Sequence, residues 1–567
     1  MHGYEKECLL GPLFKLLEAS FELMIPLVVA KIVDVGISSG SRSVILIECG
    51  IMILLGGIGL LCAVTAQWFA AKAAVGFSTR LRQGILSHIL TLSYSQMDRL
   101  GEATLITRLT SDVNQVQNGV NLTIRLLLRS PFVVFGAMVM AFRIDAESAL
   151  VFLGVIPILS LVVFGIMLIT MPMYRRVQTA LDSVTSATRE NLTGTRVLRA
   201  FCMESREKDA FQNKTEDLTK QQISAGRISA LLNPLTFVII NMAVIILIRI
   251  GAIKVSRGIL TQGLVIALYN YMSQILVELI KLANLIINMT KAAACAGRLS
   301  QLLAIEPDQK NGTCQDAIKG EVEFKEVSVS YEGAAAPALD HISFQAHPGE
   351  TIGIIGGTGS GKSTLVNLIP RLYDFQDGNL LIDGKKAEEY DLPYLRQQIG
   401  LVPQNAKLFR GTIRSNLLWG NENASQEELY AALKTAQAMD VVEGRQEGLD
   451  SAVEQEGLNL SGGQRQRLTI ARALVRKPRI LILDDSASAL DYGTEARLRK
   501  ALRNMENPPT TFIVSQRAAS VMQADKILVL DDGELAGMGT HEQLLKDCKV
   551  YQEIYFSQFP REVKSNA

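Results

Sequence analysis

The feature that most constrains this chain is the stretch 356–364, which reads Gly-Gly-Thr-Gly-Ser-Gly-Lys-Ser-Thr. Its spacing, Gly-x-x-x-x-Gly-Lys-Ser/Thr, is that of a phosphate-binding loop. An apolar, β-branched run at 351–355 precedes it and an expected helix at 365–373 follows it. This order of strand, loop and helix is the context that the motif needs, and it disfavours a glycine-rich turn with an incidental lysine. The sequence therefore predicts an α/β domain that binds phosphate groups.

Backbone amides and the helix N-terminus would hold the phosphates, and Lys362 would add a positive charge for the outer ones. Ser363 would bind Mg²⁺. We expect ATP and Mg²⁺ as ligands, and the expected nucleotide-binding residues of the loop are Gly356, Gly357, Thr358, Gly359, Ser360, Gly361, Lys362, Ser363 and Thr364.

The first half of the chain is of a different kind. With 567 residues the chain is too long for one core, and its apolar residues concentrate before residue 300. A helix needs roughly 20 apolar residues to cross a bilayer. Six stretches meet this length, near 9–35, 46–71, 126–142, 147–173, 231–253 and 262–289. The predicted fold is multidomain: an all-α, six-helix transmembrane domain at 1–300, a linker at 301–320 and an α/β nucleotide-binding domain at 321–567.

Charge distribution orients these spans. The connections after the second and fourth spans are long and rich in Arg and Lys, whereas the other connections are short and carry few charges. Positively charged loops face the cytoplasm. We therefore expect a multi-pass protein of the cell membrane with both termini and the nucleotide-binding domain in the cytoplasm. No cleaved signal peptide is expected, because residues 1–7 mix Lys with Glu.

The two long loops read as helices that continue out of the membrane and turn back near 101–112 and 201–206. These turns are either elements that couple the two domains or solvated hairpin tips. Ionisable groups also fall within the spans, namely Glu18, Glu22, Glu48, Glu278 and Lys281. Such groups are costly in lipid. Glu18 and Glu22 either recognise a cation or bond to neighbouring helices, and Glu278 could pair with Lys281.

Further motifs follow in the second half. Tyr331 offers a ring on which adenine could stack, and Gln404, just past an apolar strand, could reach Mg²⁺ or the attacking water. The segment 460–464, Leu-Ser-Gly-Gly-Gln, opens a helix and so presents a second anion site, made by Ser461, Gly462, Gly463 and Gln464. A buried strand at 480–483 ends in Asp484, which is placed to hold Mg²⁺. Asp485 and a loop at 488–491 come next.

Taken together, these motifs resemble the ATP-binding cassette (ABC) family, specifically exporter half-transporters that fuse one membrane domain to one nucleotide-binding domain. The resemblance covers nearly the whole chain, and the start of the chain, including Pro26 and the stretch 31–34, is similar to bacterial multidrug-type members. It implies that two nucleotide domains sandwich two ATP molecules. Each ATP lies between one domain's phosphate loop and the other domain's signature, which is the Leu-Ser-Gly-Gly-Gln segment at 460–464 in this chain. A second half-transporter subunit is therefore an expected partner, and the two loop turns correspond to the family's coupling helices.

Two catalytic positions depart from the family pattern. Asp485 stands where the family usually has a glutamate base, and Gln516 stands where it usually has a histidine. Losing one methylene withdraws the carboxylate by roughly 1.5 Å, whereas a base must lie within about 2.6–3.2 Å of its proton. Gln516 can donate a hydrogen bond but cannot titrate. The chain thus resembles the degenerate half of a heterodimeric exporter.

The expected function is ATP-driven, multidrug-type export of small amphipathic or hydrophobic compounds. The translocase would hydrolyse ATP mainly at the composite site that the partner's phosphate loop forms with this chain's segment 460–464. Alternatives are an ATP-gated membrane regulator, or a homodimeric exporter of lipids or peptides. Nucleic acid is not an expected partner, because no basic stripe with interleaved aromatic residues appears in the second half.

Overall fold

A computed structural model describes residues 3–331, 333–334, 336–486 and 489–559. The chain divides into two compact units. We call Met1–Leu90 with Leu100–Glu306 the helical unit, and Thr91–Arg99 with Pro307–Ala567 the α/β unit. The short segment Thr91–Arg99 thus groups with the second unit although it lies within the first half of the sequence.

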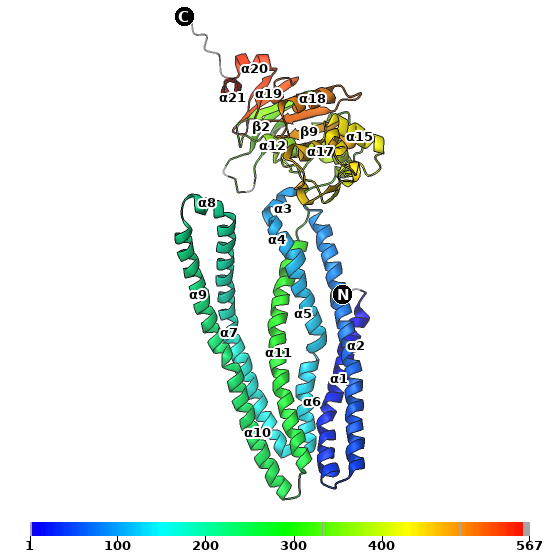
Figure 1. Ribbon diagram of the computed structural model, residues 1–567, viewed down its shortest axis with the longest axis vertical. Coiled ribbons are helices and arrows are strands. Elements are labelled where there is room, and N and C mark those ends of the chain that lie inside the picture. Colours follow the sequence, from blue (N-terminus) through cyan, green and yellow to red (C-terminus); the bar gives the residue numbers. More distant parts are fainter. Residues whose placement is uncertain (1–2, 332, 335, 487–488, 560–567) are drawn as a thin grey trace. The chain divides into compact units, whose positions relative to one another are not determined.

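Every regular element described in the helical unit is a helix (Figure 1). The α-helices are α1 Glu5–Lys31, α2 Arg42–Ile89, α4 Glu102–Thr107, α5 Val113–Leu126, α6 Arg129–Ile144, α7 Ala146–Thr193, α8 Thr195–Ala200, α9 Glu204–Ala230, α10 Leu232–Ser256 and α11 Gln262–Leu303. Two π-helical turns, Ile32–Ile37 and Arg108–Asp112, extend α1 and α4.

Five helical stretches among the described residues are long and apolar enough to cross a membrane: Arg42–Ile89, Glu102–Ile144, Ala146–Thr193, Glu204–Ser256 and Gln262–Leu303. The predicted count of six is therefore not confirmed. The first predicted span folds as the 27-residue helix α1. Its apolar part carries Lys15, Glu18 and Glu22, and this charge density separates it from the other five.

Helices α2 and α7 extend well beyond a bilayer. Each has 48 residues, or about 72 Å at 1.5 Å per residue, against a hydrocarbon core of about 30 Å. Helices α7 and α9 lie side by side and are joined through α8 (Figure 1). The chain turns between α8 and α9, as predicted for 201–206. The other predicted turn is misplaced: within 101–112 only Gly101 is non-helical, and the break begins earlier, at residues 90–93.

An ionic network joins three helices of this unit. Arg129 of α6 donates to Glu278 of α11 at 2.5 Å and to Glu22 of α1 at 2.6 Å. Glu278 also accepts from Ser130 at 2.9 Å and from Lys281 at 2.8 Å, which confirms the predicted pair. Glu22 therefore bonds to a neighbouring helix, one of its two predicted alternatives. Glu18 instead pairs with Lys15 of its own helix, and Glu48 pairs with Lys31.

The α/β unit contains two principal sheets. The larger has six strands in the order β12-β11-β3-β10-β9-β6, parallel except for β12. Its strands are β3 Thr351–Gly356, β6 Ile399–Val402, β9 Ile480–Asp484, β10 Thr510–Val514, β11 Lys526–Asp531 and β12 Glu534–Gly539. The other is antiparallel in the order β2-β1-β4-β5, with β1 Val322–Val329, β2 Leu339–Ala346, β4 Asp377–Ile382 and β5 Lys385–Lys386. A two-stranded ladder pairs β7 Gly411–Thr412 with β8 Ala452–Val453.

Both faces of the larger sheet are covered, so its strands are apolar at successive positions. Along β9, Ile480 and Ile482 enter one core, which also contains β1 and β2 residues, while Leu481 and Leu483 enter the other. The helices of the unit are α3 Tyr94–Leu100, whose last residue belongs to the helical unit, α12 Lys362–Leu368, α13 Leu392–Gln397, α14 Ile413–Leu418, α15 Gln426–Thr435, α16 Met439–Glu443, α17 Gly462–Val475, α18 Tyr492–Arg503, α19 Ala518–Val521, α20 His541–Asp547 and α21 Lys549–Gln558, with 3₁₀ turns at Ala387–Glu389, Gly448–Asp450 and Gln455–Gly457.

Helix α3 belongs to this unit through two aromatic residues. The Tyr373 hydroxyl donates to the Asp98 carboxylate at 2.7 Å, and the ring centroids of Tyr94 and Tyr373 are 6.2 Å apart. The ring of Tyr331 also contacts Tyr373, in an edge-on arrangement with the ring centroids 5.5 Å apart. A segment of the first long loop is thereby linked to the residue predicted to carry adenine.

Candidate nucleotide site

The phosphate loop joins the central strand β3 to α12, as the motif predicts. Its glycines are required by crowding and by backbone conformation. A Cβ atom at Gly356 would lie 2.2 Å from the Leu530 carbonyl oxygen, and one at Gly361 would lie 2.4 Å from that of Ala338. Gly361 also has φ of 90°, a left-handed conformation that glycine adopts without strain. The loop path therefore depends on these two residues.

Lys362 is buried at the base of the loop, with 8% of its surface exposed. Its ammonium group donates to the carbonyl oxygens of Gly356, at 3.1 Å, and Gly357, and to the Ser360 hydroxyl at 3.3 Å. Burial lowers the pKa of Lys362, while Asp485 and Asp484 act in the opposite direction. The loop thus folds around a cation that is available to an anionic ligand.

Ser363 and Asp484 form the expected metal-binding pair. The Ser363 hydroxyl donates to the Asp484 carboxylate at 3.0 Å, across 121 residues of sequence. Burial raises the pKa of Asp484, and the hydrogen bond from Ser363 opposes that shift. A hydroxyl and a carboxylate are oxygen ligands of the kind that Mg²⁺ prefers, so the donor set fits this ion.

Asp485 follows directly, with φ of 42° in the left-handed region that Asp adopts more readily than most residues. Its backbone amide donates to the Val514 carbonyl at 3.0 Å. Burial raises the pKa of the Asp485 side chain, and a hydrogen bond with Gln404 partly lowers it. Gln404 and Asp485 are therefore in contact, although nothing in the sequence pattern pairs them.

One cavity of about 380 Å³ gathers most of the residues predicted for this site. It is lined by Tyr331, Thr358, Gly359, Gly361, Lys362, Ser363, Thr364, Gln404, Asp484, Asp485 and Gln516, together with Ala338, Val514 and Ser515. Gly356, Gly357 and Ser360 lie beneath it, in contact with the Lys362 ammonium group. Tyr331 is 40% exposed and its hydroxyl lies 3.0 Å from that of Thr364.

The second predicted anion site lies at the start of α17. Ser461 caps this helix: its hydroxyl accepts from the Gln464 amide at 3.3 Å, and the Gln464 side chain accepts from the Ser461 amide at 3.0 Å. A separate cavity of about 860 Å³ is lined by Ser461, Gly463 and Gln464, and not by Gly462, which is exposed. The phosphate loop and this segment therefore line different cavities.

Asp491, at the end of the loop predicted at 488–491, lies beside this second segment, and sequence reasoning missed several of its neighbours. Asp491 caps α18 by accepting from the Thr494 amide at 2.9 Å, which lowers the pKa of the Asp491 carboxyl. Thr494, Arg497 and Arg467 also line the larger cavity. The pattern Asp-x-x-Thr is a helix-start signal, but it does not show that the starts of α17 and α18 line one cavity. Ser488, part of the loop predicted at 488–491, lies outside the described residues.

Comparison with known proteins gives matches over most of the chain. Residues 8–279 match the family model described as the ABC transporter transmembrane region, and residues 339–488 match the one described as ABC transporter. A relative from Bacillus subtilis (strain 168), the ABC transporter ATP-binding protein YfiB, is 38% identical over 96% of this chain and 95% of its own. The ATP-dependent lipid A-core flippase of Photobacterium profundum is 31% identical over 90% and 87% of the two chains.

Among solved structures, the fold is similar to that of a bacterial Atm1-family ABC exporter with ATP bound. The TM-score is 0.81 with 99% of both chains covered and 22% sequence identity. The likeness covers both the helical and the α/β parts of that protein.

Proposed function

Since the chain belongs to the ABC transporter family, we propose that it is one half of a heterodimeric exporter that uses ATP to move small amphipathic or hydrophobic compounds across the cell membrane. The helical unit would cross the bilayer six times. Helix α1 would cross it in addition to the five long apolar stretches. Both termini and the α/β unit would face the cytoplasm.

The observation that carries this proposal is the separation of the two anion sites. The phosphate loop and the α17 start line different cavities of the same unit. A nucleotide held by Lys362 and its loop therefore requires a signature from elsewhere, and Ser461 can serve a nucleotide held elsewhere. A second half-transporter subunit would supply both, so the working unit is a pair.

In the site that this chain's own phosphate loop provides, Tyr331 would stack on adenine and Lys362 would bind the outer phosphates. Ser363, Asp484 and Gln404 would hold Mg²⁺, which would neutralise phosphate charge. Asp485 would accept a proton from the attacking water, and its short side chain is hydrogen-bonded to Gln404. Gln516 would contact phosphate without titrating. These features support slow hydrolysis in this site and faster hydrolysis in the partner's.

The proposal is tested by expressing the full chain alone and with candidate half-transporter subunits, then measuring ATP-dependent ethidium uptake into inside-out membrane vesicles. Uptake is expected only for a pair, and Gly462→Asp in this chain should remove it. Equal uptake by the chain alone would reject the heterodimer. ATP turnover by a pair without uptake of any amphipathic compound would favour the regulator.

A homodimeric lipid exporter is the second candidate, because relatives that share 31% of their residues over 90% of this chain carry the name lipid A-core flippase. Under this alternative the purified chain alone would form dimers and translocate a fluorescent lipid between the leaflets of proteoliposomes. The measured mass of the purified chain in detergent separates the two candidates before any transport assay.

A further inference from the structure

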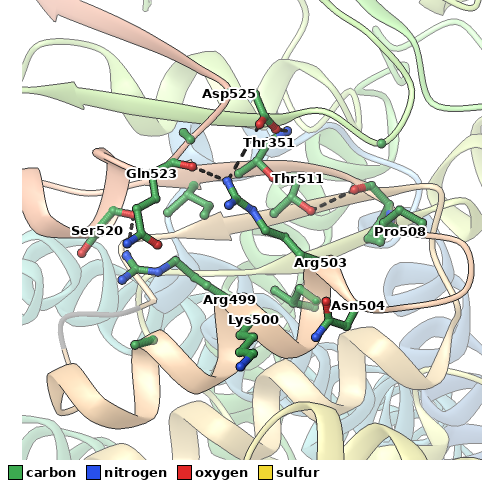
Figure 2. Close-up of a pocket in the computed structure, with 16 residues that line it drawn as sticks. Thr351, Arg499, Lys500, Arg503, Asn504, Pro508, Thr511, Ser520, Gln523 and Asp525 are labelled. Atoms are coloured by element: carbon green, nitrogen blue, oxygen red, sulfur yellow. Dashed lines mark hydrogen bonds and ion pairs between the residues drawn. The ribbon is translucent and has the colours of Figure 1, made fainter. Parts of the chain in front are cut away.

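A second kind of cavity lies away from both anion sites of the α/β unit, between α18 and the segment that follows β10 (Figure 2). Its volume is about 550 Å³, within the range of about 300–1,000 Å³ that is typical of ligand pockets. None of the described residues that line it lines the nucleotide cavity or the cavity at α17. Its position therefore leaves it without a role in the proposed transport cycle.

One side of the cavity is basic. Arg499, Lys500 and Arg503 come from the last two turns of α18, and we call these three residues the cationic wall. Lys500 and Arg503 are exposed, whereas Arg499 is half-buried. Asp525 is the one carboxylate among the described lining residues, and it accepts from the Thr351 amide at 2.8 Å while lying 3.9 Å from Arg503. The lining therefore carries an excess of positive charge.

Apolar side chains from several elements also line the cavity. These are Leu502 of α18, Pro508 and Pro509 before β10, and Ile513 of β10, and we call them the apolar wall. A site whose lining combines cations with apolar groups is complementary to a molecule that carries both an anionic group and a compact apolar body.

An independent observation comes from two polar atoms. Ser520 is 1% exposed, and its hydroxyl is buried with no hydrogen-bond partner among the described residues. The Nε atom of Arg499 is also buried with no hydrogen-bond partner among the described residues. The Nη1 atom of the same guanidinium does have partners: it donates to the Ser520 carbonyl at 2.7 Å and to Glu495 at 3.0 Å. Unsatisfied buried polar groups are rare and costly. Both groups can donate a hydrogen bond, so an acceptor-bearing ligand that drew these two side chains toward the cavity would satisfy them.

We propose that this cavity binds a small organic anion, with its phosphate or carboxylate group against the cationic wall and Ser520 and its body against the apolar wall. The elements that carry the two walls also lead to the nucleotide cavity and to the cavity at α17. Helix α18 begins at the residue after Asp491, and β10 ends two residues before Gln516. A ligand that bridges α18 and β10 would therefore stabilise elements that end at both anion sites. This inference does not rest on the export function.

The test uses the full chain in lipid nanodiscs, with both nucleotide sites saturated by a non-hydrolysable ATP analogue and Mg²⁺. The probes are 1-naphthyl phosphate and 1-naphthoate, and 1-naphthol is the neutral control with the same ring system. Equilibrium dialysis, corrected with empty nanodiscs, measures binding, and hydrogen–deuterium exchange locates it. We expect at least one anion to bind about tenfold more tightly than naphthol, with slower exchange in residues 492–525.

Two variants sharpen the test. Lys500→Glu reverses one charge on the rim, and Ser520→Ala removes the unpartnered hydroxyl; each should weaken anion binding without lowering the melting temperature. Lys386→Glu, on the exposed strand β5, makes the same change in net charge elsewhere and should leave binding unchanged. The proposal is overturned if naphthol binds as well as the anions, if Lys500→Glu and Lys386→Glu behave alike, or if exchange slows only near residues 356–364 or 461–475.

Discussion

Two opposing effects act on the charge of Lys362. Its ammonium group is bonded to oxygen atoms of the loop that surrounds it, at 3.1 Å from Gly356 and 3.3 Å from Ser360. Burial meanwhile lowers its pKa, which disfavours the charged form. An anionic ligand would supply negative charge and so favour the charged form of Lys362. The lysine is therefore held where a phosphate would gain most from it.

The residue-scale prediction is that Lys362→Ala weakens ATP binding at this chain's own site by about 10- to 100-fold, because a hydrogen bond to a charged group contributes about 1.5–3 kcal/mol. Photolabelling with an azido-ATP analogue, followed by peptide mapping, measures occupancy at this site. Lys546→Ala, on an exposed turn of α20, is the matched control. Occupancy equal to that of the control would refute the assignment of the loop.

Asp485 and Gln404 show the limit of prediction for single residues. The sequence singled out both, each beside an apolar strand, because chemistry-bearing residues follow buried strands in this kind of fold. The contact between them could not be predicted, since it depends on β6 and β9 being neighbours in the sheet. The positive φ at Asp485 is likewise a property of the folded loop.

At the scale of elements, α3 links the first long loop to the predicted adenine residue. The chain of contacts runs from Asp98 through the hydroxyl and ring of Tyr373 to the ring of Tyr331. Burial raises the pKa of Tyr373, with Asp98 adding to the shift, so the phenol stays protonated and donates at neutral pH. The sequence placed the turn of this loop several residues later, because nothing local marks residues 91–93 as a stop.

Tyr373→Phe is expected to loosen α3 by removing one hydrogen bond while keeping the ring. Amide exchange in residues 91–100 should accelerate by about tenfold, as measured by mass spectrometry. Asp98→Ala should have the same effect and Asp98→Asn very little, because an amide oxygen still accepts from the phenol. The double variant Tyr373→Phe, Asp98→Ala should be no faster than either single one. Additive effects would show that the hydrogen bond does not hold the helix.

In the helical unit, the ionic network among α1, α6 and α11 joins elements that are far apart in the sequence. Apolar stretches predicted these helices well, since length and hydropathy are properties of one segment at a time. The partner of Glu22 and Glu278 was not predicted. Arg129 is the first residue of α6 and meets two carboxylates 107 and 149 residues away, and only tertiary packing brings the three together.

Glu278→Gln should destabilise the helical unit by about 3–5 kcal/mol, because it leaves the buried guanidinium of Arg129 with one carboxylate instead of two. Unfolding in mixed micelles, followed by circular dichroism, gives the free energy. Replacing both members, Arg129→Met with Glu278→Leu, should cost less than Glu278→Gln alone, since the charges left without partners, Glu22 and Lys281, have side chains that are 38% and 44% exposed. Costs that simply add would contradict a coupled pair.

For the whole molecule, the two anion sites should contribute unequally to ATP turnover. The loss of a working base typically costs about 10²–10⁴-fold in rate. The short side chain of Asp485 already incurs most of that loss under the proposed function. Asp485→Asn should therefore change the turnover of an assembled pair only slightly.

Gly462→Asp should instead abolish most turnover. Apart from its chain neighbours and the adjacent backbone of α17, no atom of the described residues lies within 4 Å of the position that a Cβ would take at Gly462, so the chain itself accommodates the change. The added negative charge would face the phosphate of the partner's nucleotide. Gly462→Asn, which has the same bulk and no charge, separates the two effects. Steady-state hydrolysis by each variant with unmodified partner is the measurement, and equal losses for Asp485→Asn and Gly462→Asp would refute the degenerate site.

Under the proposed function, the short side chain of Asp485 also limits the work that an assembled pair can do. If only one of the two composite sites splits ATP in each cycle, the free energy of one ATP drives each transport event. Since about 1.4 kcal/mol corresponds to a tenfold concentration ratio, halving the supply of free energy reduces the steepest sustainable gradient to its square root. A pump of this kind would suit compounds that must be kept moderately dilute at low cost, and an exporter with two splitting sites would suit those that must be driven uphill furthest.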